Sequence, residues 1–206
     1  YNNNPARVTQ MDHPSPLAMM MMMMMMMIKM MMMMTMYKHY TTGHVNNDDD
    51  QWLYLPALGR VKRISSSNKS GSFMGSEISF EDFSGLDYRK YDWNYLGEEE
   101  YDGEICFKLE SYPKYKNSGY TKRIGLTDNL FRAKKINYYD RKGELLKTIY
   151  FEDYKLYLDK IWNADTFKVV NHQNNNSTIY KWINRKLNVG LNKKDFEKSS
   201  LLKLAD

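Results

Sequence analysis

The sequence contains a single cysteine, Cys106, among its 206 residues. One thiol cannot form an intramolecular disulfide, and it cannot supply the set of thiolates that holds a structural zinc ion. The four histidines are scattered without metal-ligand spacing, and the chain has no GxSxG, GxxxxGK or HExxH motif. The sequence therefore gives no sign of a metal site, a cofactor or a nucleophile paired with a base, and we expect no enzymatic activity.

Neither sign of charge dominates the chain. Lys and Arg number 30 and Asp and Glu number 25, which gives a formal net charge of +5 at pH 7. Because the two signs are interspersed, this small excess does not indicate a nucleic-acid partner. A chain of this length can bury a substantial core, and we expect a single domain over residues 1–206.

Methionine is the one residue type in clear excess. Fourteen of the 17 methionines form two runs, 19–27 and 30–34. A membrane span or a signal-peptide core is built mainly from Leu, Ile, Val, Ala and Phe, so a run of methionine alone is typical of neither. We interpret residues 19–34 as unassigned residues written as methionine and take no chemistry from them. Because the first residue is Tyr1, we also expect that a cleaved leader is missing.

Most of the remaining chain has the alternating, aromatic-rich pattern of short β-strands joined by Gly-, Asn- and Asp-containing turns. The expected strands cover 51–56, 60–64, 88–96, 104–112, 120–126, 130–139, 145–151, 167–172 and 177–187. Other expected elements are turns at 98–103 and 140–143 and a short helix within 192–204. So many strands with so little helix indicate one antiparallel sheet with a buried face.

The strand expected at 104–112 shows the alternation most clearly. Ile105, Phe107 and Leu109 alternate with charged residues, as in a half-buried antiparallel strand. Two interpretations of these apolar side chains remain open. They either pack as ordinary core or line a cavity on the concave side of the sheet.

One block is more specific than a generic β pattern. Residues 52–83 read WLYLPALGRVKRISSSNKSGSFMGSEISFEDF. This block closely resembles the signature of the outer-membrane lipoprotein-sorting family, the LolA-like domain proteins, and the resemblance extends over about residues 36–202. The chain departs from the family where the methionine runs replace a basic hairpin and where only residues 41–50 precede the block. The matching positions are Trp52, Leu55, Pro56, Arg60, Arg63, Ile64, Gly71, Phe73, Met74, Gly75, Glu81 and Asp82.

The resemblance implies both a fold class and a function. The fold would be mainly β (α+β): a curved, antiparallel, incompletely closed β-barrel, or half-barrel, with a helical lid. The chain would be a monomeric, non-enzymatic periplasmic carrier. It would bind the acyl chains of a lipid or lipoprotein in an apolar cavity and move them toward the outer membrane, with or without an anchor there. The alternatives are an accessory protein of an inner-membrane transporter that carries no ligand and, least favoured, a lipid hydrolase.

The candidate site residues come from the signature block and from the strands that follow it. Those expected to line the cavity and its mouth are Trp52, Tyr54, Leu55, Phe73, Met74, Phe80, Phe83, Tyr91, Trp93, Ile105, Phe107 and Leu109. Arg60 and Arg63 are expected to pair with Glu81 and Asp82 and so fix the loop to the sheet. Alternatively, these arginines meet a lipid headgroup or an acidic partner. The two carboxylates also allow an acid–base pair, but a turn held through backbone N–H groups is the simpler interpretation.

Overall fold

The structure is a computed structural model, and the residues that it describes are 39–42, 50–55, 58–83, 88–190, 193–196 and 200. The methionine runs and the hairpin that they replace lie outside these residues, and so does the predicted helical lid. The predicted C-terminal helix is described only in part, as a short 3-10 helix. No helix in the described part of the chain is both long enough and apolar enough to cross a membrane.

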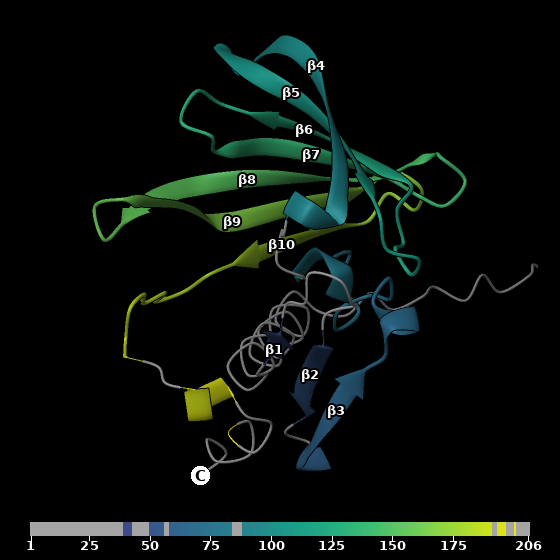
Figure 1. The fold of residues 1–206 in the computed structure, drawn as a ribbon, viewed down its shortest axis with the longest axis vertical. Coiled ribbons are helices and arrows are strands. Elements are labelled where there is room, and N and C mark those ends of the chain that lie inside the picture. The colour runs from purple at the N-terminus through teal and green to yellow at the C-terminus, as the bar shows by residue number, and fades with distance from the viewer. Residues whose placement is uncertain are drawn as a thin grey trace, which may run out of the picture.

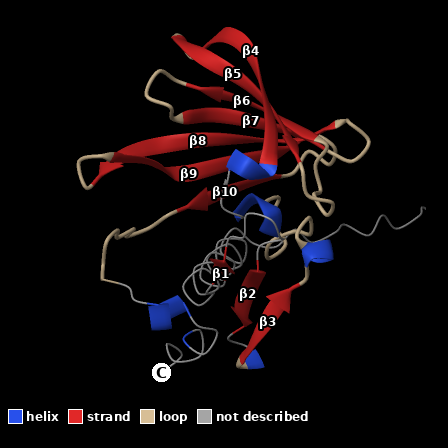
Figure 2. Cartoon of the chain, in the orientation of Figure 1, coloured by secondary structure: helices blue, strands red, loops and turns tan. Residues whose placement is uncertain are grey.

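The regular structure of the described residues is almost entirely β (Figure 2). The strands are β1 (His39–Thr42), β2 (Asp50–Leu55), β3 (Arg60–Ile64), β4 (Tyr91–Tyr101), β5 (Glu104–Pro113), β6 (Lys122–Thr127), β7 (Ala133–Tyr139), β8 (Leu145–Tyr157), β9 (Ile161–Asn171) and β10 (Ser177–Lys181). The 3-10 helices are η2 (Ser66–Asn68), η3 (Phe80–Phe83), η4 (Tyr88–Lys90) and η5 (Lys193–Phe196).

The strands form two antiparallel sheets. The larger sheet has seven strands in the order β10-β9-β8-β7-β6-β5-β4, and the smaller has the order β1-β2-β3. Because every neighbour in the larger sheet is also next in sequence, that sheet is a meander of hairpins. β10 and β4 are its two edges and do not pair with each other, so the sheet stays open (Figure 1). The predicted mainly β, incompletely closed architecture is confirmed.

The hydrophobic core lies on one face of the larger sheet, which we call the inner face. Ile149 in β8 lies opposite Ile136 in β7 and Val169 in β9. Ile78 reaches this face from the segment 71–83 between the two sheets and is buried with Ile149 and Val169 in one cluster. The inner face is thus partly covered by chain that precedes the sheet in sequence.

The opposite, outer face carries charged pairs between neighbouring strands. Lys108 Nζ lies 2.7 Å from Glu99 Oε2, and Lys122 Nζ lies 3.0 Å from Glu110 Oε1. Such partly exposed pairs contribute only about 0–1 kcal/mol each. They keep much of this face polar, although Cys106 and Leu126, which share the face with Lys108, are buried.

The turn predicted at 98–103 is wrong for most of its length. β4 continues to Tyr101, and the turn itself is the pair Asp102–Gly103, with φ of 55° and 76°. Glutamates favour solvent and are typical of turns, but Glu99 forms ion pairs with Lys108 of the neighbouring β5 and with Lys135 of β7. These pairs let a charged sequence continue as an edge strand.

The predicted ends of the last three strands also differ from the structure. β8 continues past the predicted 145–151 to Tyr157, and β9 begins at Ile161, before the predicted 167–172. Charged side chains pair across this longer hairpin, with Lys155 Nζ 2.7 Å from Asp165 Oδ2. β10 ends at Lys181 rather than continuing to residue 187. The chain leaves the sheet there, and Asn184 adopts a φ of 55° that no strand contains.

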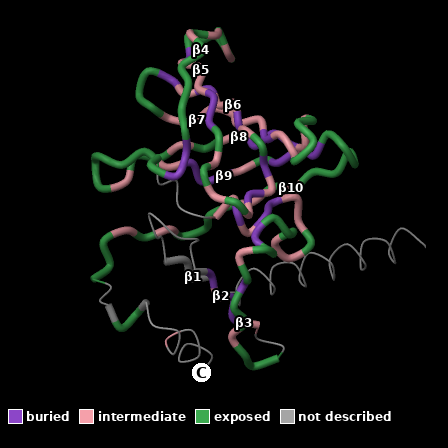
Figure 3. Tube along the Cα trace, turned by 45° about the vertical axis from the view of Figure 1, so that its right-hand side comes forward, coloured by how far each residue is buried: buried purple, intermediate pink, exposed green. Residues whose placement is uncertain are grey.

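The smaller sheet lies beyond the β10 edge of the larger one (Figures 1 and 3). One contact with the rest of the chain runs from β2, where Gln51 Nε2 donates a hydrogen bond to Phe80 O over 2.9 Å. Leu53 and Tyr54 of β2 are buried. This hydrogen bond joins the small sheet to the segment that covers the inner face.

Candidate functional site

The register of β4, β5 and β6 places a row of apolar side chains on the inner face. Tyr95 lies opposite Leu109, Leu109 opposite Gly125, and Gly125 opposite the core residue Ile136. Because side chains alternate between the faces of a strand, the other members of the row follow from these pairs. We call this row the inner strip, and it consists of Trp93, Tyr95, Ile105, Phe107 and Leu109.

Exposure along the inner strip increases from one end to the other. On β4, Tyr91 is 8% exposed, Trp93 44% and Tyr95 61%. On β5, Ser111 is buried, whereas Ile105, six residues earlier in the strand, is 56% exposed. Six residues of strand span about 20 Å. The inner strip therefore has a closed end inside the protein and an open end at solvent.

The loop between β6 and β7 adds another aromatic ring at the open end. Phe131 is largely exposed and stacks on Phe107, with ring centroids 6.2 Å apart. Asp128 holds this loop, because it accepts hydrogen bonds from the backbone N–H groups of Leu130 and Arg132 and from Nε of Arg132 over 2.7–3.0 Å. Burial acts to raise the pKa of Asp128, but the hydrogen bonds from Arg132 outweigh burial and leave this pKa below its usual value.

The segment 71–83, which we call the covering segment, closes another part of the inner face. Met74 and Gly75, with φ of 55° and 76°, form the turn of a miniature hairpin, and the Phe73 N–H donates to Ile78 O over 2.7 Å. A non-glycine residue tolerates such a φ only at some cost. The hairpin and the η3 turn that follows bring apolar side chains down onto the core.

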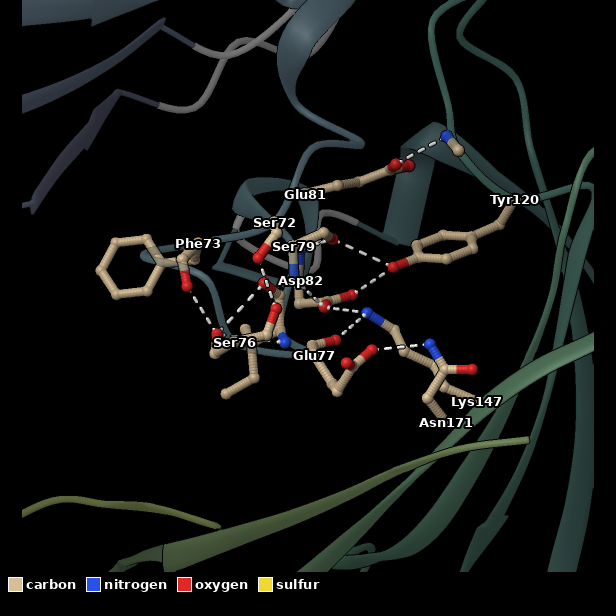
Figure 4. A network of polar contacts seen from close by, with 12 residues as sticks. Ser72, Phe73, Ser76, Glu77, Ser79, Glu81, Asp82, Tyr120, Lys147 and Asn171 are labelled. Carbon is tan, nitrogen blue, oxygen red and sulfur yellow. Dashed lines mark hydrogen bonds and ion pairs between the residues drawn. The ribbon is translucent and has the colours of Figure 1, made fainter. Parts of the chain in front are cut away.

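Asp82 attaches the covering segment to β8 through a buried ion pair. Lys147 Nζ lies 2.6 Å from Asp82 Oδ2, and both side chains are almost fully buried (Figure 4). Lys147 also donates to Glu77 O over 2.9 Å, while Asp82 accepts from Tyr120 OH over 2.8 Å and from the Ser79 N–H over 2.7 Å. Every partner helps to compensate a charge that would otherwise be costly to bury.

Glu81 attaches the same segment to the loop that precedes β6. Its Oε1 accepts from Tyr115 OH over 2.6 Å and from Ser118 Oγ over 2.5 Å, and its Oε2 accepts from the Gly119 N–H over 2.7 Å. A Cβ on Gly119 would come within 2.7 Å of Ser70 Cβ and 3.3 Å of Glu81 Oε2. This close approach explains why the loop has a glycine at that position.

Glu77 makes a third attachment, toward β9 and β10. Its carboxylate accepts from Asn171 Nδ2 over 2.6 Å and from Asn174 Nδ2 over 3.2 Å, and its backbone N–H donates to Thr178 Oγ1 over 3.1 Å (Figure 4). The hydrogen bond from Asn171 is the main reason that the pKa of Glu77 lies below its usual value. The three acidic residues of the covering segment therefore all serve as anchors.

The tyrosines around these anchors remain protonated donors. Burial, more than any neighbouring charge, raises the pKa of Tyr115, Tyr120 and Tyr138. A phenol with a raised pKa donates a hydrogen bond but does not serve as a base near neutral pH. The cluster is thus suited to holding the segment and poorly suited to proton transfer.

The structure gives Glu81 and Asp82 partners other than the predicted Arg60 and Arg63. Both arginines lie on β3 of the smaller sheet and are exposed. The hydrogen-bonded partners of the two carboxylates, within the described residues, come from Ser79 just before η3, from β8 and from the loop before β6. The simpler interpretation of these carboxylates agrees with their contacts, because each accepts a backbone N–H. Position in sequence suggested the arginines, but the meander brings other strands closer.

The predicted cavity residues lie in three separate places. On β2 of the smaller sheet are Trp52, Tyr54 and Leu55. On the covering segment are Phe73, Met74, Phe80 and Phe83. Edge-to-face contacts join Phe73 to Phe83 (4.8 Å) and Phe83 to Tyr180 of β10 (5.5 Å). At the opposite edge of the sheet, on β4 and β5, are Tyr91, Trp93, Ile105, Phe107 and Leu109.

Sequence reasoning missed three positions beside the inner strip: Phe131, Arg123 and Gly125. Phe131 belongs to the predicted strand 130–139, but β7 begins only at Ala133, so the loop carries this ring and its sequence gives no sign that it stacks on β5. Arg123 and Gly125 belong to a predicted strand, but the face to which each points depends on the pairing with β5 and β7. That register could not be read from one sequence.

Proteins of known structure to which the chain is similar include the following three. One, from Vibrio parahaemolyticus, is named as an outer membrane lipoprotein-sorting protein domain and shares 49% identity over 79% of this chain and 69% of that chain, with a TM-score of 0.76. A DUF1329 family protein from Desulfovibrio piger shares 35% identity over 80% and 70% of the two chains, with a TM-score of 0.74. A LolA superfamily protein from Nitrosomonas europaea shares 20% identity over 73% of this chain and 67% of that chain, with a TM-score of 0.58. At this identity the similarity indicates a shared fold only.

The open seven-stranded meander with a covering segment is thus a LolA-like fold. Residues 31–203 match a family profile described as an uncharacterized protein, and no curated protein is detectably similar. The chain belongs to the family of the outer membrane lipoprotein-sorting domain and the DUF1329 protein. The resemblance recognised in the signature block is confirmed.

Proposed function

We propose that this protein is a non-enzymatic periplasmic carrier that binds an acyl chain of a lipid or lipoprotein along the inner strip and moves it toward the outer membrane. The observation that carries the proposal is the uncovered part of the strip, where Trp93, Tyr95 and Ile105 share one sheet face and have large exposed fractions. Glu98 and Glu100 of β4 lie opposite Phe107 and Ile105 and so border the open end of the strip. Contiguous exposed apolar surface marks a ligand or partner site.

Covering the strip contributes free energy of the same order as the cost of association. Covering about 300 Å² of apolar surface contributes about 7 kcal/mol at about 25 cal/mol per Å². Association itself costs about 4–15 kcal/mol, so the guest must also bury its own apolar surface, as an acyl chain does. A long, flexible hydrocarbon fits a strip of about 20 Å better than a compact metabolite does.

Membership of the family supports the carrier role and the compartment. A relative with 49% identity is named for outer membrane lipoprotein sorting. A protein with that role works between the two membranes, so export to the periplasm is part of the proposal. The acidic residues support a non-enzymatic role, because Glu81 and Asp82 are occupied by the donors that fix the covering segment.

A fluorescent long-chain fatty acid tests the proposal through two matched substitutions. Ile105→Glu adds a charge to the inner strip, whereas Ile179→Glu adds the same charge on the outer face at a residue of nearly equal exposure, 56% against 59%. We expect saturable binding by the wild-type chain, a loss of about tenfold or more for Ile105→Glu, and little change for Ile179→Glu.

Two results would count against a carrier. Equal affinity of Ile105→Glu and the wild-type chain would mean that the guest does not occupy the inner strip. Failure of any apolar probe to saturate the wild-type chain, together with a fixed partner in pull-down experiments, would favour the accessory protein of a membrane transporter.

A further inference from the structure

A buried arginine stands at the closed end of the inner strip. Arg123 in β6 lies opposite Ser111 in β5 and Tyr138 in β7, which places it on the inner face, and it is only 7% exposed. Its guanidinium carbon lies 3.8 Å from the ring centroid of Tyr91, and its Nε donates to Ser111 Oγ over 3.2 Å. Arg123 is therefore held in place by stacking and by one hydrogen bond.

One hydrogen-bond donor of the Arg123 guanidinium has no acceptor in the described part of the chain. Nη2 of Arg123 is buried and has no hydrogen-bond partner, and no carboxylate within the described residues forms an ion pair with it. Glu81 is instead hydrogen-bonded to Tyr115, whose hydroxyl lies 2.9 Å from the hydroxyl of Tyr91. A guanidinium stays charged at every physiological pH, and a buried donor without an acceptor is destabilising. An oxygen anion brought by a guest would satisfy it.

The next inner-face position of β6 carries no side chain. Gly125 lies between Leu109 and Ile136, and a Cβ built there would meet Ile136 Cγ1 at 3.5 Å and Lys135 O at 3.8 Å, which are ordinary contacts. Neither crowding nor a positive φ therefore requires a glycine. Glycine weakens the interior of a strand and often marks the close approach of a ligand. The bare position leaves room for a guest directly beside Arg123.

We infer that the inner strip takes a free, single-chain lipid with an anionic head, a carboxylate or a phosphate, that enters head first. The head accepts hydrogen bonds from Nη2 of Arg123 and from the hydroxyl of Ser111. The chain passes over Gly125 and leaves along the strip toward Ile105. This inference rests on the proposed function and narrows it, because a polypeptide attached to the head could not follow it into the buried end.

Three lipids with the same chain length and different head groups distinguish the contribution of the head to affinity from that of the chain. Hexadecanoate, hexadecyl phosphate and methyl hexadecanoate each displace an uncharged apolar dye from the full chain. We expect the carboxylate or the phosphate to bind at least about tenfold more tightly than the ester. Arg123→Met removes that preference and leaves the ester affinity unchanged. The matched control Lys122→Met removes a positive charge from the adjacent residue, which faces the outer surface, and keeps the preference.

The remaining variants distinguish binding from folding. Gly125→Val weakens binding of all three lipids while the melting temperature stays the same or rises. Should Arg123→Met fail to fold, Arg123→Lys keeps the charge but loses the planar fork, and we expect an intermediate preference. Equal affinity of acid and ester, or an unchanged acid affinity in folded Arg123→Met, overturns the inference. Absence of dye binding to the wild-type chain instead overturns the carrier proposal itself.

Discussion

Replacing Lys147 by methionine tests whether the covering segment is held by its buried ion pair. Lys147 and Asp82 are almost fully buried and 2.6 Å apart, and Lys147 also binds Glu77 O. The substitution leaves Asp82 buried without its cation. Removing one partner of such a pair costs about 3–5 kcal/mol. For a chain of this size, that loss corresponds to a fall in melting temperature of about 6–20 °C.

Urea unfolding followed by tryptophan fluorescence measures this free energy. The control is Lys114→Met, because Lys114 and Asp92 form a pair of 3.7 Å in which both side chains are largely exposed. We expect the control to lose no more than about 1 kcal/mol. The double variant Lys147→Met with Asp82→Asn should lose less than the sum of the two single losses. Equal losses for Lys147→Met and Lys114→Met would refute the reasoning.

Three further predictions concern the loops around the inner face. Gly119→Ala should lower the free energy of unfolding by about 1–3 kcal/mol, because its Cβ meets Ser70 at 2.7 Å, whereas Gly125→Ala, with no contact under 3.5 Å, should be nearly neutral in the same urea assay. Asp128→Asn should destabilise at neutral pH, and the difference from the wild-type chain should shrink as pH falls below about 4, since a lowered folded pKa gives stability that is lost only in acid; a difference independent of pH would contradict this. Phe131→Ala should weaken binding of a fluorescent fatty acid while changing stability by less than about 0.5 kcal/mol, and a large loss of stability would show that Phe131 is core.

The alternation of apolar and polar residues in the sequence was sufficient to predict which residues of β5 belong to the inner strip. In β5, Ile105, Phe107 and Leu109 follow one another at every second position, and the structure puts all three on the face that bears the core. The signature block was recognisable for a similar reason, because its residues are contiguous. Its aromatic side chains nevertheless pack near β10, at the opposite edge of the sheet from the inner strip.

Contacts between distant strands could not be predicted in the same way. Lys122 and Arg123 are adjacent basic residues, yet one forms an ion pair on the outer face and the other is buried on the inner face. Nothing in their local sequence distinguishes them until the register with β5 is known. Lys147 is a similar case, because its partner Asp82 lies 65 residues earlier in the chain.

Extraction of the purified full chain with organic solvent, followed by mass spectrometry, addresses the carrier proposal most directly. We expect about one acyl lipid per wild-type chain, much less from Ile105→Glu, and a wild-type amount from Ile179→Glu, since only Ile105 lies on the inner strip. A wild-type chain that releases no lipid and that no added fatty acid can load would contradict the proposal.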